Sequence, residues 1–519
     1  MPAARPAARP APRPASVPAR QLTLSSRDGR GALTATVLGS GMVFLDGTIA
    51  NVAARQIGTD FSAGFASLQW VLNGYALALA SLILLGGSLG DRFGRRSVYL
   101  TGMVWFASAS VLCALAPSVH ILIAARVLQG IGGALLTPGS LSLIQASFAP
   151  QDTGRAVGLW SGMSGVSTAV GPLLGGYLVE HISWRWAFGI NVPLAAVAMI
   201  LALRYLPESR SDEEEGPLDL LGTVLIALGL GALTYGTTAA GDTGWKALSL
   251  ACTLGGLAVL TLFVLVEART EYPLLPPRLF RDRTFTGANL MTFTTYGSLG
   301  AVIFLLVLNL QVAGGYGPLA AGLATLPTTL LLLLLSPRAG ALSARIGPRL
   351  PMIIGPVVAA VGIALTARID RHHHSYLVDV LPGILVFGLG MSFLVAPLTS
   401  TVMASAPRND VGLASGVNNA VARSAALLAV AVLPPLAGLT GERYRIPDVM
   451  AHGYRVVVAI CVGLLVLGAV VVAFTLRSGT LMDIGRAAGD ATGDDHTKEA
   501  HGVQAERATD SATDSRPGG

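Results

Sequence analysis

Apolar residues fill long stretches of this chain, and each stretch is bounded by a short polar or charged segment. A helix that crosses a bilayer needs about 20 predominantly apolar residues, and the stretches between Gly31 and Leu476 reach that length. Fourteen membrane-spanning helices are predicted, at 31–54, 68–90, 97–116, 119–145, 155–179, 185–206, 218–239, 246–267, 285–312, 317–337, 350–368, 377–402, 411–438 and 454–476. The predicted fold class is therefore an all-α integral membrane protein.

The composition argues against a soluble protein. Of the 519 residues, 52% are hydrophobic and 12% are charged, whereas a soluble domain has about 25% charged residues. The net charge of +6 does not indicate nucleic-acid binding, because the basic residues lie in short loops and tails rather than on one face. The three cysteines lie far apart inside apolar stretches and have neither metal-ligand nor disulfide spacing.

Arginines distinguish the two sides of the membrane. The loops after the second, eighth and tenth predicted helices are rich in them, and the loops after the first, third, seventh and ninth are nearly bare of basic residues. The arginines in the rich loops are Arg92, Arg95, Arg96, Arg269, Arg278, Arg281, Arg283, Arg338, Arg345 and Arg349. The positive-inside rule then places both termini in the cytoplasm. Arg443, Arg445 and Arg455, after the thirteenth helix, run against this rule.

The two ends of the chain differ in composition from the rest. Residues 1–30 are rich in Pro, Ala and Arg, and residues 477–519 are rich in Gly, Asp, Thr and Ser. Segments with so little apolar content do not build a core. Both are predicted to be disordered cytoplasmic tails.

A degenerate internal repeat divides the apolar region. The segment Gly87–Arg96 follows the second predicted helix, and Gly340–Arg349 follows the tenth with Gly, Leu, Arg and Gly in the same register. Many transporters are built from such repeats, with the substrate site between them. We expect two six-helix halves, 31–206 and 285–476, with two extra helices inserted in residues 207–284.

Several motifs make the sequence similar to a known family. The Gly87–Arg96 segment resembles the loop motif of the major facilitator superfamily. Further motifs resemble those of its fourteen-helix drug:proton antiporters, namely Leu45–Val52 in the first helix, Arg126–Gly133 in the fourth, Gly171–Gly176 in the fifth, Trp184–Pro193 at the entry to the sixth, and Asp219 with Gly222 at the seventh. The resemblance covers residues 31–476 and implies the major facilitator fold, proton-coupled export, and no cofactor beyond the proton motive force.

The chain departs from the family pattern in two places. Ser167 stands four residues before Gly171, where a glycine is usual. The tenth predicted helix lacks the acidic residue that some relatives use for divalent cations, so the resemblance gives no support to dicationic substrates.

Asp46 is the first candidate for proton coupling, because an acid inside an apolar helix can hold a proton in one conformation and lose it in another. Arg126 is its expected partner. Each lies about seven residues from the outer end of its predicted helix, which is ~10 Å below the outer surface at ~1.5 Å per residue. A buried arginine needs a counter-charge or carbonyl groups. The alternative is an acid held by hydrogen bonds for packing alone.

Two further motifs have expected mechanical roles. A conformational latch is predicted at the cytoplasmic face, formed by Asp91, Arg92, Gly94 and Arg95. The positive charge of this loop also sets the orientation of the chain in the membrane. The resemblance implies that Gly171, Pro172, Gly175 and Gly176 shape the seam between the halves, with the glycines packing against the other half.

The other polar residues within the predicted helices are candidates for the lining of a substrate cavity, or equally for contacts between helices. They are Gln69, Asn73, Tyr75, Gln129, Trp160, Asn309, Gln311, Asn418, Asn419 and Arg423. A mostly apolar lining with a few polar groups suits amphipathic compounds better than sugars.

The predicted function is proton-coupled export of drug-like or antibiotic compounds across the cell membrane, by a protein that works as a monomer. The alternative is export of an endogenous metabolite, such as a self-made antibiotic, a siderophore or an amino acid. An enzyme is not expected, since no catalytic or metal-ligating cluster faces one side of the membrane. The expected partners are protons, the lipid bilayer and small amphipathic molecules, and not nucleic acid.

Overall fold

The computed structural model describes residues 21–210, 217–407 and 410–476, and almost all of these residues are helical. The helices are α1 (Arg27–Asp60), α2 (Phe65–Phe93), α3 (Arg95–Ala114), α4 (Val119–Ser147), α5 (Pro150–His181), α6 (Arg185–Gly189), α7 (Asn191–Tyr205), α8 (Leu220–Thr243), α9 (Ala247–Glu267), α10 (Arg283–Val312), α11 (Pro318–Ile346), α12 (Arg349–Thr366), α13 (Leu381–Ala404), α14 (Val411–Leu436) and α15 (Pro447–Thr475). The all-α membrane fold predicted from the sequence is confirmed.

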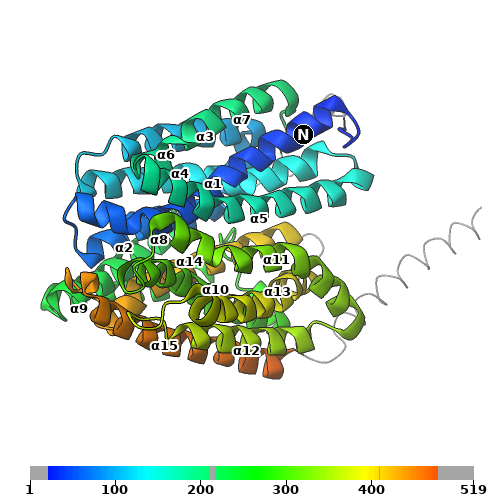
Figure 1. The fold of residues 1–519 in the computed structure, drawn as a ribbon. Coiled ribbons are helices and arrows are strands. Elements are labelled where there is room, and N and C mark those ends of the chain that lie inside the picture. The colour runs from blue at the N-terminus through cyan, green and yellow to red at the C-terminus, as the bar shows by residue number, and fades with distance from the viewer. Residues whose placement is uncertain (1–20, 211–216, 408–409, 477–519) are drawn as a thin grey trace, which may run out of the picture.

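Two groups of helices pack side by side (Figure 1). The N-terminal group comprises α1–α7, and the C-terminal group comprises α10–α15. Helix α8 contacts both α2 and α14, and α9 packs on α8. The inserted pair therefore lies along one edge of the junction between the groups.

Thirteen helical segments of the described ranges are long and apolar enough to cross a membrane, and α6 with α7 counts as one of them. Helix α5 lies among these segments in the bundle and would make a fourteenth span, but it is not among the thirteen. Its sequence carries many glycines, serines and threonines, which lower its hydropathy. This composition fits its place between the groups, where small residues let helices approach closely.

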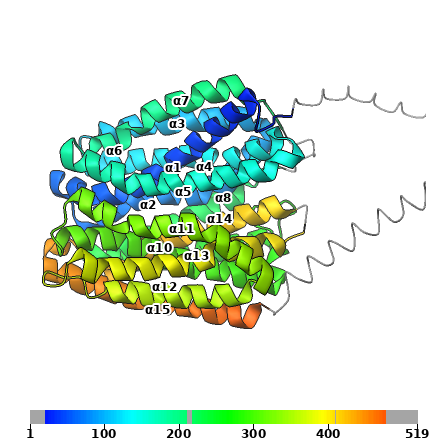
Figure 2. The same ribbon diagram turned by 45° about the vertical axis from the view of Figure 1, so that its right-hand side comes forward.

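The start of α1 and the end of α15 lie at the same end of the bundle (Figure 2), which we name the terminal end. We name the opposite end the far end. Helix α1 begins at Arg27, inside the segment expected to be a tail, because the Ser26 side chain caps it by accepting a hydrogen bond from the Gly29 amide. Just before it, Leu22 is tied by main-chain hydrogen bonds to Ser147 and Ala149. Residues 1–20 and 477–519 lie outside the described ranges.

The internal repeat has a structural counterpart. Gly94 ends α2 and precedes α3 with φ +108°, and Gly347 ends α11 and precedes α12 with φ +84°. Only glycine adopts such angles at little cost. The same turn therefore joins equivalent pairs of helices in the two groups.

Hydrogen bonds join the two groups toward the far end. The Phe65 amide donates to the Gly441 carbonyl at 2.9 Å, and the Arg445 guanidinium donates to the Gly58 carbonyl at 3.0 Å. The Leu319 amide, at the start of α11, donates to Glu180 Oε2 on α5 at 2.9 Å. The far end is closed in this structure.

Toward the terminal end, α5 and α11 diverge. A Cβ built on Gly165 would lie 3.6 Å from the Leu333 side chain, but one built on Gly154, Gly158 or Gly162 would meet nothing within 4 Å. The space between the two groups therefore widens toward the terminal end.

Candidate functional site

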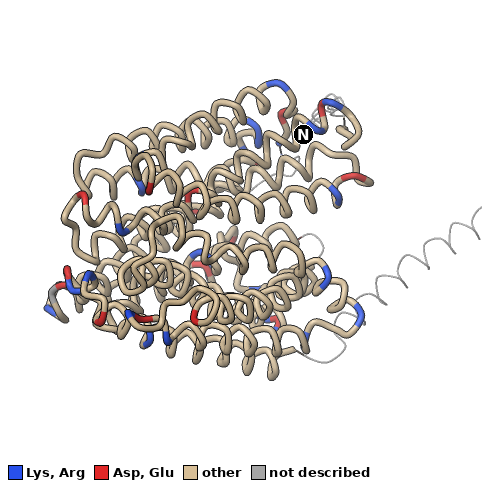
Figure 3. Tube along the Cα trace, in the orientation of Figure 1, with Lys and Arg blue, Asp and Glu red and all other residues tan. Residues whose placement is uncertain are grey.

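Charged residues gather at the two ends of the bundle, and few lie between them (Figure 3). Asp46 and Arg126 are exceptions, and both are 1% exposed. Asp46 lies near the middle of α1, and Arg126 lies in the first half of α4. They form an ion pair between Arg126 Nη1 and Asp46 Oδ2 that is closed to solvent.

Two amides complete the coordination of the Asp46 carboxylate. Gln129 Nε2 donates to Asp46 Oδ1 at 2.8 Å, and Asn191 Nδ2 donates to the same oxygen at 3.0 Å. The two amides also reach Ser110 Oγ, at 2.8 Å and 3.3 Å. We name these residues, Asp46, Ser110, Arg126, Gln129 and Asn191, the Asp46 cluster.

Arg126 has several partners besides the carboxylate. Its Nη1 donates to Gln129 Oε1 at 2.6 Å, and its Nε donates to the Val71 carbonyl of α2 at 3.0 Å. The guanidinium carbon also lies 4.3 Å from the centroid of the Tyr75 ring and 5.5 Å from that of Phe188. Cation–π contacts of this kind reach about 2 kcal/mol when desolvated. One arginine thus links α1, α2, α4 and α6.

Ser110 and Asn191 were not among the residues singled out for proton coupling. Asn191 is the first residue of α7, directly after the break that separates α6 from α7. It stood within the Trp184–Pro193 motif, so its position in the motif was the available signal. Ser110, four residues before the end of α3, carried no such signal.

The opposite side of α1 faces a cavity between the two groups. Phe44, Thr48 and Asn51 are half-buried and share one helix face, whereas Asp46 points into the N-terminal group. Thr48 and Asn51 line the cavity together with threonines of α11 and apolar side chains of α10 and α13. Its volume is about 130 Å³, which is below the ~300 Å³ at which drug-sized sites begin.

The residues proposed from the sequence as cavity lining do not border this cavity, and most have other partners. Gln69 donates to the Val430 carbonyl, and Gln311 donates to the Val52 carbonyl at 3.2 Å, both across the junction between the groups. A buried side-chain amide requires a hydrogen-bond partner, and these two find theirs on a neighbouring helix rather than in the cavity. The remaining contacts are Tyr75 with the Val43 carbonyl, Trp160 with Ser40, Asn309 with the Ile369 carbonyl and Asn418 with Thr292.

The side chains of three of those candidates, Asn73, Asn419 and Arg423, have no such hydrogen bond among the described residues. Asn73 is buried, and its Nδ2 has no partner among the described residues. Asn419 and Arg423 are half-buried, lie one turn apart on α14, and so share a face of that helix.

The glycines of the seam motif contact two different helices. A Cβ on Gly171 would lie 1.9 Å from Thr48 Oγ1, and one on Gly175 would lie 3.1 Å from the Ile49 side chain, so both pack against α1 within the N-terminal group. A Cβ on Gly176 would lie 2.5 Å from Leu319 Cα of α11. The expectation that these glycines pack against the other half is therefore corrected, since only Gly176 among them does so.

The residues of the proposed latch lie at the terminal end. Arg95 Nε donates to Asp91 Oδ1 at 2.7 Å, and Arg92 lies beside the ring of Phe93. The start of α3 is held by Glu208, which accepts hydrogen bonds from the amides of Arg96 and Ser97. Glu208 therefore caps the N-terminus of α3.

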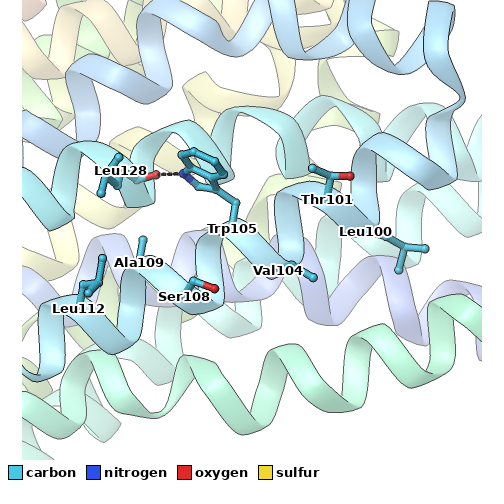
Figure 4. A pocket seen from close by; sticks show the side chains of 8 residues that line it. All are labelled: Leu100, Thr101, Val104, Trp105, Ser108, Ala109, Leu112 and Leu128. Carbon is cyan, nitrogen blue, oxygen red and sulfur yellow. Dashed lines mark hydrogen bonds between the residues drawn. The ribbon is translucent and has the colours of Figure 1, made fainter.

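A second hollow lies on the outer surface of α3 and α4 (Figure 4). It has a volume of about 560 Å³ and is lined mainly by apolar side chains, including Leu100, Val104 and Leu112. Trp105 lies in it and donates its Nε1 proton to the Leu128 carbonyl at 2.7 Å. This surface faces away from the junction between the groups, and it carries no ionisable side chain.

Comparisons with known proteins agree with this architecture. The family model of the Major Facilitator Superfamily matches residues 36–430 and 288–490. The chain is 35% identical over 403 residues to Multidrug resistance protein Stp of Mycobacterium tuberculosis, covering 77% of this chain and 74% of the relative. It is 35% identical over 468 residues to Puromycin resistance protein pur8 of Streptomyces alboniger, covering 87% of this chain and 91% of the relative.

Solved structures support the same fold. A bacterial homolog of the human lysosomal transporter Spinster, in an inward-facing and unoccupied conformation, superposes with a TM-score of 0.63 at 18% identity, covering 89% of this chain and 99% of that structure. The chain therefore belongs to the Major Facilitator Superfamily, and it is a multi-pass membrane transport protein rather than an enzyme.

Proposed function

We propose that this protein is a proton-coupled antiporter that exports drug-like or antibiotic organic compounds across the cytoplasmic membrane by alternating access. The relatives named for multidrug and puromycin resistance support the substrate class. The observation that carries the proposal is the Asp46 cluster, a sealed carboxylate on the helix that also borders the cavity.

The two groups of helices are, in this proposal, the halves that move, and the terminal end faces the cytoplasm. The arginine-rich loops favour this orientation. Two of the three arginines that run against the rule have structural partners, because Arg445 donates to the Gly58 carbonyl and Arg455 pairs with Asp370 at 3.2 Å. With this orientation the closed far end is external, and the widening between the groups opens to the cytoplasm.

Protonation of Asp46 changes the energy of the cluster by a large amount. A protonated Asp46 leaves Arg126 as a buried cation without its counter-charge, and losing one partner of a buried ion pair costs about 3–5 kcal/mol. Moving a two-state equilibrium from 1:99 to 99:1 takes about 5.5 kcal/mol. A single proton on Asp46 is therefore sufficient to bias the conformation strongly.

The partners of Arg126 determine which helix is released when Asp46 is protonated. When Asp46 is neutral, Arg126 keeps the Gln129 oxygen, the Val71 carbonyl and the Tyr75 ring, so it remains bound to α2 and α4. Helix α1 then loses its strongest link to α4. Because Thr48 and Asn51 of α1 line the cavity, movement of α1 couples proton binding to the substrate site.

The cavity supports an amphipathic substrate. Its lining combines threonine hydroxyls with apolar side chains, which gives few hydrogen bonds and a large apolar surface. At about 130 Å³ it is too small for a drug-sized molecule. Binding therefore requires α5 and α11 to move apart beyond what this conformation shows, and the Asp91–Arg95 pair is proposed to latch the terminal end in one of the two states.

The test is export by full-length protein in a drug-sensitive bacterium, with Asp46→Asn and Asp448→Asn compared at equal membrane amounts. Asp448 is a control because its side chain is 75% exposed at the far end. The wild type and Asp448→Asn should protect against a panel of antibiotics and dyes, and a proton uncoupler should remove the protection. Asp46→Asn should lose it. Protection that survives both the uncoupler and Asp46→Asn would contradict proton antiport.

A further inference from the structure

Arg423 is a charged side chain near the middle of α14, and its environment differs from that of Arg126. It is half-buried, whereas Arg126 is sealed inside the N-terminal group. Among the described residues, no carboxylate pairs with Arg423, and its guanidinium forms no hydrogen bond. Its contact is with Phe44 of α1, whose ring centroid lies 5.5 Å from the guanidinium carbon.

This contact places Arg423 at the junction between the two groups. Phe44 is one turn from Thr48 on the half-buried face of α1, and Thr48 lines the cavity. Phe44 and Arg423 lie near the middle of their helices. The guanidinium therefore lies at mid-depth beside the cavity, on the side toward the terminal end, where the groups diverge.

The surroundings of Arg423 contain no acid that could neutralise it. The neighbouring tyrosines, Tyr75 and Tyr296, carry no carboxyl group. The acid at this depth, Asp46, is already bound to Arg126. An arginine within a membrane protein usually pairs with an acid, with carbonyl groups or with a ligand, and the first two are not present here.

We propose that Arg423 is a specificity-determining residue that binds the anionic group of the exported molecule, a carboxylate or an ionised phenol on an otherwise apolar body. This inference rests on the proposed export function and names its substrate class as amphipathic organic acids. The planar guanidinium offers two parallel N–H groups to a carboxylate. Phe44 and the threonine-lined cavity contact the apolar body, and Asn419 adds a neutral donor one turn away.

The experiment measures binding of a matched pair of fluorescent probes to full-length protein in nanodiscs. Dansylglycine carries a carboxylate, and dansylglycinamide has a neutral amide in its place. Hydrogen bonds to a charged group contribute about 1.5–3 kcal/mol, so the wild type should bind dansylglycine about 10- to 100-fold more tightly than the amide. Arg423→Gln should bind the two probes equally, and Arg423→Lys should keep part of the preference. Arg345→Gln, at the exposed terminal end of α11, is the matched control and should behave as the wild type.

Three results would overturn the proposal, namely equal binding of both probes by the wild type, a preference that persists in Arg423→Gln, and no binding of either probe. The outcome for export is separate. Asp46→Asn should retain the preference for dansylglycine while losing export. A wild type that shows the preference but exports no compound would refute the export function and leave the anion site in place.

Discussion

Gly176 lies where α5 touches α11 of the other group, and alanine at this position should open the far end. A Cβ there would stand 2.5 Å from Leu319 Cα and 3.0 Å from the Pro318 carbonyl oxygen. Ordinary contacts of a Cβ atom begin at 3.4 Å. The Leu319 main chain therefore has to retreat by about 0.9 Å, the difference between 3.4 Å and 2.5 Å.

The cost of this clash sets the size of the effect. Forcing an extra methyl group into a packed contact costs about 1–3 kcal/mol. The cost arises only while the far end is closed, because the clashing atoms belong to different groups. Relief of the clash should therefore shift the equilibrium toward a far-end-open state by about 5- to 150-fold.

A cysteine in the cavity reports this shift. Thr329→Cys on α11 lines the cavity, and Cys252→Ser removes the one native cysteine that is not buried. A membrane-impermeant maleimide applied from the far-end side should label Gly176→Ala faster than the wild type by the stated factor. Gly463→Ala on the exposed face of α15 is the control, since a Cβ there meets nothing within 4 Å.

The reasoning is refuted if Gly176→Ala and Gly463→Ala are labelled at the same rate at equal amounts in the membrane. A slower rate in Gly176→Ala would contradict it as well, because the clash would then act against the open state.

Two further predictions concern the far end and its loops. Gln69→Leu leaves the Val430 carbonyl without its donor, at a cost of about 1–3 kcal/mol, so cavity labelling from the far-end side should rise, whereas Gln56→Leu at an exposed position should not change it; equal rates would contradict this role. Partial burial works to raise the pKa of Asp370, but hydrogen bonds from His372 and His373 outweigh it and hold the pKa at about 2. The folded pKa is below the unfolded value of ~3.9, so the loop stability that Asp370 contributes is present above that value and lost as the pH falls toward 2. In the wild type, pepsin should therefore cleave this loop at about pH 2 but not at about pH 4, and in Asp370→Asn it should cleave at both. Cleavage of the wild type at about pH 4 would contradict this role of Asp370.

The fold could be predicted because the bilayer imposes long apolar helices, and these are visible in the sequence as uninterrupted stretches. The ends were less certain, since α1 begins at Arg27 rather than at Gly31. The pairing of Asp46 with Arg126 followed from depth alone, because an α-helix rises by a constant amount per residue. Both side chains then had few alternatives inside an apolar bundle.

The lining of the cavity could not be predicted in the same way. Depth does not say which side of a helix a residue faces, and a helix that is apolar all round gives no periodic signal. Gln69 and Gln311 looked like cavity residues, but they bond main-chain carbonyls of the other group. The threonines that border the cavity were overlooked because a threonine hydroxyl commonly bonds a carbonyl of its own helix, as those of Thr48 and Thr325 do.

Gly171, Gly175 and Gly176 show the same limit at finer scale. Residues four apart lie on one face of a helix, and adjacent residues point about 100° apart. Gly171 and Gly175 therefore share the contact with α1, and Gly176 meets α11. The motif marked the segment correctly but could not assign its partners.

The prolines at the far end of α14 have a consequence for how this transporter could change over time. Pro434 and Pro435 lack the N–H groups that would bond the Val430 and Ala431 carbonyls, and Gln69 donates to both of these oxygens. The acceptors belong to the main chain, so most substitutions of the side chains on α14 leave them in place. If Arg423 binds the substrate as proposed, variation at Asn419 or Arg423 would alter the spectrum of exported compounds without loosening the closure of the far end, and selection would act on substrate choice and on sealing independently.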